Sequence, residues 1–209
     1  MSALERQHWN EQYAQSKSRK YPDPDPLLLQ YTPPSTRRHA GAKDGVEEWV
    51  SSSTHALDLA CGVGQNGLWL AQQGYHVDLL DISREGLARA QTTALERGLS
   101  NVNFMLGDLD EVALKNEAYD LLCVFRYLKR DLLPRIRMAI RGQGRVIYQT
   151  YTTDYLATRP TMNPEYLLRP GELERYFADW KILYSTELSG VAKLVAIKPM
   201  SPSNPLTSL

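Results

Sequence analysis

The stretch Ala56-Leu57-Asp58-Leu59-Ala60-Cys61-Gly62-Val63-Gly64-Gln65-Asn66-Gly67 decides the fold of this 209-residue chain. Its first residues are mostly apolar and predict a buried strand, and the glycines that follow predict a tight turn. Leu68 to Ala71 then continue as a helix. A strand, a glycine-rich turn and a helix in this order predict a cofactor cradle, because the first N–H groups of the helix are available to a ligand.

Strands and helices are expected to alternate along the rest of the chain. Apolar runs bounded by turn residues predict strands, and apolar residues three or four apart predict the helices between them. The last two strands are joined closely, so they are expected to pair antiparallel. The sequence therefore predicts a three-layer α/β/α sandwich with a mostly parallel seven-stranded sheet and an antiparallel C-terminal hairpin. The expected strands are 55–60, 75–80, 102–106, 119–125, 145–151, 180–185 and 192–198.

Three parts of the chain differ in character. Residues 1–54 are expected to form an N-terminal helix and a proline-rich lead-in that can act as a lid, with a loop at 37–45 and a helical turn at 46–50. Residues 55–198 are expected to form the single cofactor-binding domain, and residues 199–209 a disordered tail. Residues 152–169 show little periodicity, and a connection of this length predicts a second lid.

The overall charge limits the classes of partner. The chain has 24 basic and 24 acidic residues, so no net field draws it to nucleic acid or to an anionic membrane, and a small molecule is the expected partner. Cys61 and Cys123 are far apart and predict neither a metal site nor a disulfide framework. The first ten residues lack the apolar run of a signal peptide, so a soluble, cytoplasmic protein is expected, as a monomer or a homodimer.

Two kinds of cofactor are compatible with the glycine turn. Gly62, Gly64 and Gly67 satisfy G-x-G-x-x-G, and Asp81 follows at the distance typical of a dinucleotide fold. Asp58 separates the two possibilities, because a carboxylate just before the first glycine disfavours a pyrophosphate and favours a cationic amine. S-adenosylmethionine carries such an amine at its methionine end.

Residues 58–66 (DLACGVGQN) resemble motif I of class I S-adenosylmethionine-dependent methyltransferases. The resemblance continues through Asp81-Ile82-Ser83, Gly107-Asp108 and Tyr119-Asp120. Within this superfamily the chain is similar to the tellurite-resistance and thiol methyltransferase-like branch, through residues 9–13 (WNEQY) and 166–173 (YLLRPGEL). The proline-rich segment and residues 37–53 depart from the shorter lead-in of that branch, which leaves the methyl acceptor open.

The resemblance implies a role for each residue of the cofactor site. Asp81 would accept hydrogen bonds from the ribose hydroxyls, or would be a helix N-cap or a surface acid, and Asp108 would accept from the adenine amine, or would be a capping residue. Ile82 and Leu109 would sandwich the adenine ring, or would simply pack in the core. Asp58 would face the amine, or would tie the glycine loop to a backbone N–H group. The rest of the cradle would be Ala60, Cys61, Gly62, Gly64, Asn66 and Phe125.

The methyl acceptor is expected beyond the end of the fourth strand. Arg126 could bind an anionic acceptor there and Tyr127 could line its pocket, while a solvated helix face explains the basic residues of 126–141. The lids would contribute Trp9, Tyr13, Arg159 and Arg169.

The expected function is methyl transfer from S-adenosylmethionine to a small molecule by in-line displacement. The acceptor could be a thiol, an oxyanion of tellurium or selenium, or another metabolite. The alternatives are an NAD(P)-dependent oxidoreductase that uses the same glycines and a catalytically idle, methyltransferase-like binding protein.

Overall fold

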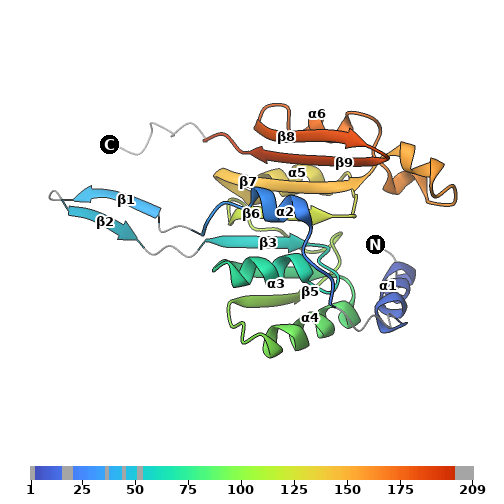
Figure 1. The fold of residues 1–209 in the computed structure, drawn as a ribbon, viewed down its shortest axis with the longest axis horizontal. Coiled ribbons are helices and arrows are strands. Elements are labelled where there is room, and N and C mark those ends of the chain that lie inside the picture. The colour runs from blue at the N-terminus through green and yellow to red at the C-terminus, as the bar shows by residue number, and fades with distance from the viewer. Residues whose placement is uncertain (1–2, 16–20, 36–37, 44–45, 51–53, 201–209) are drawn as a thin grey trace.

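The central feature of the computed structural model, which describes residues 3–15, 21–35, 38–43, 46–50 and 54–200, is a seven-stranded sheet (Figure 1). Its strand order is β5-β4-β3-β6-β7-β9-β8. The five strands from β5 to β7 pair in parallel, and β9 pairs antiparallel with both β7 and β8. The predicted fold class is therefore confirmed. The strands are β3 (His55–Leu59), β4 (His76–Asp81), β5 (Val102–Leu106), β6 (Tyr119–Phe125), β7 (Ile140–Tyr151), β8 (Lys181–Leu188) and β9 (Val191–Ile197).

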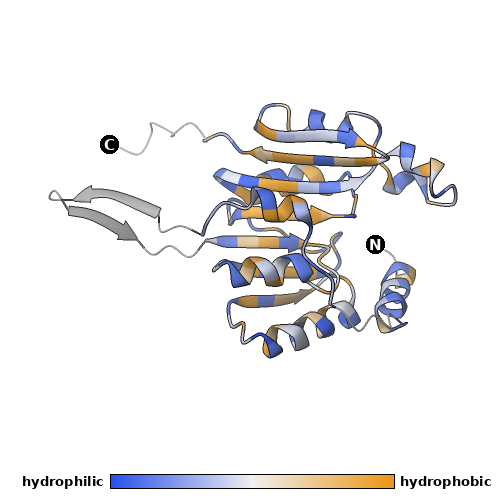
Figure 2. Cartoon of the chain, viewed as in Figure 1, coloured by the Kyte–Doolittle hydropathy of each residue, from blue (hydrophilic) through white to orange (hydrophobic). Residues whose placement is uncertain are grey.

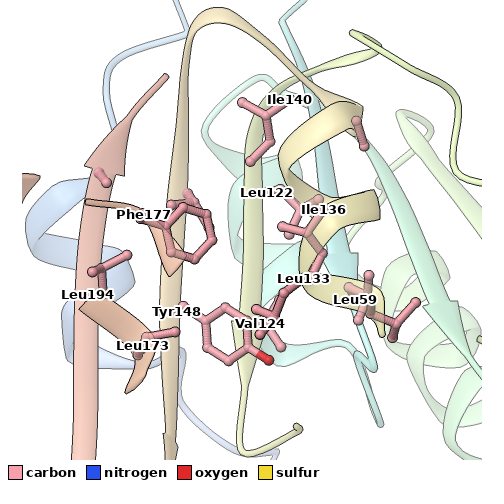
Figure 3. Close-up of a cluster of buried hydrophobic side chains, with 14 of the residues drawn as sticks. Leu59, Leu122, Val124, Leu133, Ile136, Ile140, Tyr148, Leu173, Phe177 and Leu194 are labelled. Atoms are coloured by element: carbon pink, nitrogen blue, oxygen red, sulfur yellow. The ribbon is translucent and has the colours of Figure 1, made fainter. Parts of the chain in front are cut away.

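Helices cover both faces of the sheet because side chains alternate along each buried strand. On β6, Leu121 and Cys123 pack with α2 (Pro26–Tyr31), α3 (Gln65–Gln72) and α4 (Arg84–Glu96). Leu122 and Val124 point to the other face and pack with α5 (Leu132–Ala139) and α6 (Glu172–Tyr176), the cluster shown in Figure 3. Figure 2 shows the same arrangement as apolar strands between helices of mixed hydropathy. Within the described ranges, no helix has the length and apolar character needed to cross a membrane.

Local sequence explains where the helices begin and end. Gly74, with φ of 91°, follows the end of α3 in the left-handed conformation that favours glycine. Ser83 caps α4 by accepting a hydrogen bond from the Gly86 N–H at 3.1 Å. Asp25 caps α2 in the same way, through the Leu27 N–H at 2.9 Å. These caps fix the helix starts next to the carboxyl ends of the strands.

The structure corrects the expected elements in three places. Residues 38–43 and 46–50 form an antiparallel pair, β1 (Arg38–Lys43) and β2 (Val46–Val50), where a loop and a helical turn were predicted. A five-residue segment is too short for an isolated helix, and its valines and tryptophan favour a strand. β7 starts at Ile140 rather than 145. The second lid contains two short 3-10 helices, η1 (Thr153–Ala157) and η2 (Pro164–Tyr166); most of the predicted disordered tail, 201–209, lies outside the described residues.

Candidate active site

The candidate site lies at the carboxyl edge of the sheet, where the strand order changes direction. The chain runs outward from β3 to β4 and β5, and then returns to place β6 on the other side of β3. Such a switch point leaves a crevice at the strand ends. In Figure 1 the arrowheads of β3 and β6 point toward the side where helix α1 (Ala3–Gln15) and the loop after β7 lie.

The glycine turn holds three residues in the left-handed region. Gly62 and Gly64 have φ values of 59° and 78°, and Ala60 has 55°, a conformation that costs a non-glycine residue about 1 kcal/mol. A Cβ atom on Gly62 would collide with the Tyr13 hydroxyl. Glycine is therefore required at position 62 both by its φ and by the close approach of another group.

Asp58 is almost completely buried beneath this turn, with 1% of its surface exposed. Its Oδ2 accepts a hydrogen bond from the Gly67 N–H at 2.8 Å, and its Oδ1 lies 3.5 Å from the Cys123 thiol. Burial raises the pKa of the Asp58 carboxyl to about 7, although the Gly67 and Cys123 hydrogen bonds oppose the shift. Asp58 therefore ties the glycine loop to a backbone N–H group through its Oδ2, and contact between Asp58 and an amine stays a prediction.

Asp81 closes the glycine turn from the end of β4. Its Oδ2 accepts a hydrogen bond from the Gly62 N–H at 2.7 Å and its Oδ1 from the Ser83 N–H at 2.8 Å. Because Ser83 caps α4, the alternative in which Asp81 is the helix cap is wrong. Burial raises the pKa of the Asp81 carboxyl, and the backbone N–H groups of Ser83, Gly62 and Ile82 oppose that shift. Each oxygen keeps a lone pair available for a further donor.

A cavity of about 450 Å³ lies between the ends of β4 and β5 and helix α1. Ile82 and Asp108 line it, and their contact with an adenine ring stays a prediction. Asp108 also accepts a hydrogen bond from the Asp110 N–H at 2.9 Å, so the turn-capping role is present too. Leu109 does not line the cavity: it is fully buried in the cluster around α5, and Leu106 lines the cavity in its place.

Two residues that the sequence did not single out, Arg6 and Asn10 of α1, also line this cavity. Asn10 accepts hydrogen bonds from the Ser83 hydroxyl at 2.8 Å and from the Glu85 N–H at 3.4 Å. Their spacing in the sequence could have indicated a shared role, because Arg6 and Asn10 lie on the same helix face as the expected lid residue Tyr13. The expected lid residues Trp9 and Tyr13 stack with their ring centroids 6.0 Å apart.

The lead-in before β3 is fastened over the glycine turn. The Tyr21 hydroxyl donates a hydrogen bond to the Val63 carbonyl, and the Asp25 N–H donates to Asn66 Oδ1 at 2.8 Å. Gln149 of β7 donates to Asp25 Oδ2 at 2.9 Å. Asn66 therefore positions this segment through its side chain, and the segment covers the α3 side of the site.

The two acceptor-side candidates follow the end of β6. Arg126 is exposed, has φ of 59°, and donates its backbone N–H to the Gln149 carbonyl at 2.7 Å. Within the described part of the chain, no hydrogen bond or ion pair holds its guanidinium group. Tyr127 is half-buried, and burial raises the pKa of its hydroxyl. Arg126 is thus a strained, unpaired cation at the active edge, which is compatible with ligand binding.

Aromatic rings from β7 and η1 adjoin this cation. Tyr151 stacks on Tyr155 with ring centroids 4.1 Å apart. The positive charges of Arg126 and Arg159 both lower the pKa of the Tyr151 hydroxyl, against a larger upward shift from burial. A role for Arg159 toward the acceptor stays a prediction. Arg169 instead starts the turn before α6, where its backbone N–H binds Glu172 at 2.8 Å.

Other expectations concern the two cysteines, Phe125 and the basic run after β6. Cys61 and Cys123 are buried, and burial raises the pKa of both thiols, so neither is a ready nucleophile. Phe125 packs in the cluster around α3. Apart from Arg126, the basic run is not a solvated face, because its members bind carbonyls and carboxylates of neighbouring segments. These cations are Lys129, Arg130, Arg135, Arg137 and Arg141.

Comparison with known proteins gives one family and several relatives. The model of the tellurite resistance protein TehB family matches residues 30–195. Hemagglutinin 1 of Eikenella corrodens is 28% identical over 165 residues, which cover 75% of this chain and 53% of the relative. A Haemophilus influenzae protein named probable S-adenosyl-L-methionine-dependent methyltransferase TehB is 27% identical over 165 residues, covering 75% and 55%.

The fold also agrees with a solved structure. The crystal structure of TehB from Haemophilus influenzae superimposes with a TM-score of 0.60 at 22% identity, covering 71% of this chain and 58% of that chain. At this identity the likeness concerns the fold. This chain spans about half the length of the curated relatives it matches.

Proposed function

The chain belongs to the TehB family of tellurite resistance proteins, and we propose that it is an S-adenosylmethionine-dependent methyltransferase with a small-molecule acceptor. The observation that carries the proposal is Asp81, a buried carboxylate that the Gly62 and Ser83 N–H groups hold at the end of β4. Its remaining lone pairs suit a pair of vicinal hydroxyls. The adjoining cavity, lined by Ile82 and Asp108, suits a flat ring with an amine donor.

The residues present fit this cofactor better than a dinucleotide. A buried carboxylate, Asp58, lies under the glycine turn where a pyrophosphate would need positive charge. The family relationship supports the same choice, because the Haemophilus influenzae relative is named as an S-adenosylmethionine-dependent enzyme. The set of three buried carboxylates also argues against an idle binding protein, since a fold alone does not need them.

Bound S-adenosylmethionine would supply an electrophilic methyl group on a good leaving group. The chain itself would then need only to bind, orient and exclude water. Asp81, Asp108 and Ile82 would hold the nucleoside, and Asp58 would favour the amine. Arg126 and Tyr127 would orient the acceptor from the end of β6, with Tyr151 and Arg159 completing its surroundings.

Candidate acceptors are thiols and oxyanions of tellurium or selenium. The unpaired Arg126 guanidinium supports an anionic group, because a cation with a free donor fork binds oxyanions well. The proposal places the enzyme in solution, as a monomer or a homodimer, with no nucleic-acid partner.

The test of this function has two stages. Isothermal titration with S-adenosylmethionine should give measurable binding to the wild-type chain and much weaker binding to Asp81→Asn. Incubation with methyl-labelled cofactor and sodium tellurite, sodium selenite or 2-mercaptoethanol should then transfer label to at least one acceptor. Absence of heat at millimolar cofactor would rule out the proposed function, and binding without transfer to any acceptor would rule out these acceptor classes.

A further inference from the structure

Helix α1 meets the candidate site along one face. Arg6, Asn10 and Tyr13 are four and three residues apart, so they project from the same side of the helix. Arg6 and Asn10 line the cavity that contains Asp108. Tyr13 lies against the glycine turn, because a Cβ atom on Gly62 would collide with its hydroxyl.

The three contacts follow the site from one end to the other. Arg6 is next to the expected adenine pocket, and Asn10 binds Ser83, whose N–H holds Asp81. Tyr13 is next to Gly62 of the glycine turn, and burial, followed by the charge of Asp81, raises the pKa of its hydroxyl. Seven residues of α-helix span about 10 Å. This length suits an extended nucleoside with an amino-acid arm.

Packing into the core does not explain the position of α1. The helix has no buried residue, and its hydrophobic Leu4 is 77% exposed. Figure 2 shows it as a mostly hydrophilic helix. Hydrogen bonds join it to the start of α4 and to Arg89, which donates to the Tyr13 carbonyl at 3.2 Å, and the Tyr13 ring lies against Gly86. A helix without buried apolar contacts detaches from the domain at a low free-energy cost. Core packing therefore does not account for the residues that it directs toward the site.

We propose that the Arg6, Asn10 and Tyr13 face of α1 is a wall of the cofactor site. This inference rests on the proposed function, and it assigns one residue to each part of S-adenosylmethionine. Arg6 covers the adenine ring, Asn10 borders the ribose, and the Tyr13 hydroxyl meets the amino-acid end.

The chemistry of each residue fits its assignment. In the described part of the chain no hydrogen bond or ion pair holds the Arg6 guanidinium, and this planar group stacks well on an aromatic ring. Asn10 uses its Oδ1 on Ser83 and Glu85, so its amide N–H groups remain as donors toward the ribose. The Tyr13 hydroxyl stays protonated, because burial and the nearby carboxylates raise its pKa, and it can donate to a carboxylate.

Two binding probes separate the assignments. S-adenosylhomocysteine carries both the adenosine and the amino-acid end, whereas 5′-methylthioadenosine lacks the amino-acid end. Isothermal titration should show that Arg6→Ala weakens both probes about tenfold, since both contain adenine. Tyr13→Phe should lower the affinity for S-adenosylhomocysteine about fivefold and leave that for 5′-methylthioadenosine within twofold. The lost hydroxyl is assigned to the amino-acid end, which only S-adenosylhomocysteine carries.

Controls keep the test independent of folding and of the function itself. Gln12→Ala changes an exposed residue of the same helix and should leave both affinities within twofold. Arg6→Lys keeps the charge without the planar group and should fall between wild type and Arg6→Ala. Circular dichroism at the binding temperature confirms that each variant is folded.

The outcomes distinguish the two proposals. Wild-type binding that neither Arg6→Ala nor Tyr13→Phe changes would overturn the wall and leave the function standing. A Tyr13→Phe loss that is equal for both probes would overturn the assignment of Tyr13 to the amino-acid end. A wild-type chain that binds neither probe would overturn the function and the wall together.

Discussion

The two ends of the active edge are built in different ways. At the ends of β3 and β4, backbone N–H groups 2 to 19 positions away in the sequence hold Asp58 and Asp81. At the ends of β6 and β7, side chains from distant segments come together, as in the contact between Gln149 and Asp25. The two carboxylates of the cofactor end are therefore held by backbone groups within 19 positions, whereas the acceptor end depends on contacts between segments more than 100 positions apart.

The acceptor end has its own fastening. Arg130 binds both oxygens of Glu172, at 2.6 and 2.8 Å, and the carbonyls of Glu165 and Leu167 at 3.0 and 2.9 Å. These bonds hold the loop after β7 against the start of α5. A hydrogen bond from the Tyr166 hydroxyl to Glu5 at 2.7 Å then links this loop to α1, which lies over the cofactor end. Changes at one end should affect the other only through such links.

The largest expected effect concerns Asp58 and pH. Its pKa is about 7 in the folded chain and near 3.8 in the unfolded chain. Between pH 4 and 7 the folded state therefore holds a proton that the unfolded state has lost, and wild-type stability falls as the pH rises. Asp58→Asn removes this loss, on the order of 4 kcal/mol. Urea unfolding from pH 4 to 9 should show the stability difference between variant and wild type growing up to pH 7, and a constant difference would contradict the buried-acid assignment.

Among variants at the cofactor end, Asp81→Asn should cause the largest loss of cofactor affinity. An amide nitrogen would face either the Gly62 or the Ser83 N–H group, and one carboxylate oxygen would be lost to the ribose. We expect the affinity for S-adenosylhomocysteine to fall about 100-fold, measured by isothermal titration. Asp131→Asn is the matched control, because that carboxylate is exposed and makes no cap hydrogen bond; equal losses in both variants would refute the specific role.

Glu172→Gln tests whether the acceptor end can be destabilised without a change at the cofactor end. It breaks the paired bond with Arg130 and should lower the free energy of unfolding by about 2 kcal/mol. Limited proteolysis within residues 152–169 should accelerate, while the affinity for S-adenosylhomocysteine stays within twofold. Glu165→Gln, at an exposed side chain, is the control. A binding loss as large as that of Asp81→Asn would show that the two ends are not separable.

The smallest effect is expected where the two ends touch. Tyr166→Phe removes the hydrogen bond to Glu5 and keeps the ring, so α1 should open more often. Stopped-flow displacement should show S-adenosylhomocysteine dissociating about threefold faster. Tyr184→Phe on β8, whose ring packs on Tyr31, should leave the rate unchanged. Identical dissociation rates for Tyr166→Phe and wild type would show that the two ends act independently.

The contrast between the cofactor end and the acceptor end also explains which site residues could be predicted from the sequence. Asp58, Asp81 and Asp108 were identifiable because each follows a strand pattern, and parallel strands bring their ends to one edge. For Leu109 the sequence left adenine contact and core packing open, because the direction of its side chain depends on the turn at Asp108; Leu109 packs in the core, and Leu106 at the end of β5 lines the cavity. The strands β1 and β2 were missed because five or six residues carry too weak a periodicity.

Arg6 and Asn10 were missed for a different reason. Their helix was expected from the sequence, but an exposed and mostly hydrophilic helix does not indicate where it docks. Only the hydrogen bonds of Asn10 with Ser83, 73 positions later in the chain, place it over the cavity. The link from Tyr166 to Glu5 spans 161 positions and carries no sequence signal at all.

The sequence by itself determined the order of strands and helices, the glycine turn and the three carboxylates at the strand ends. Hydrophobic periodicity and glycine conformation are local properties, so the residues that carry them reveal them. Only the tertiary structure decided which lid residues reach the cofactor cavity and which arginines bind neighbouring loops. Those contacts join segments far apart in the chain, and their geometry exists only after the sheet has brought the segments together.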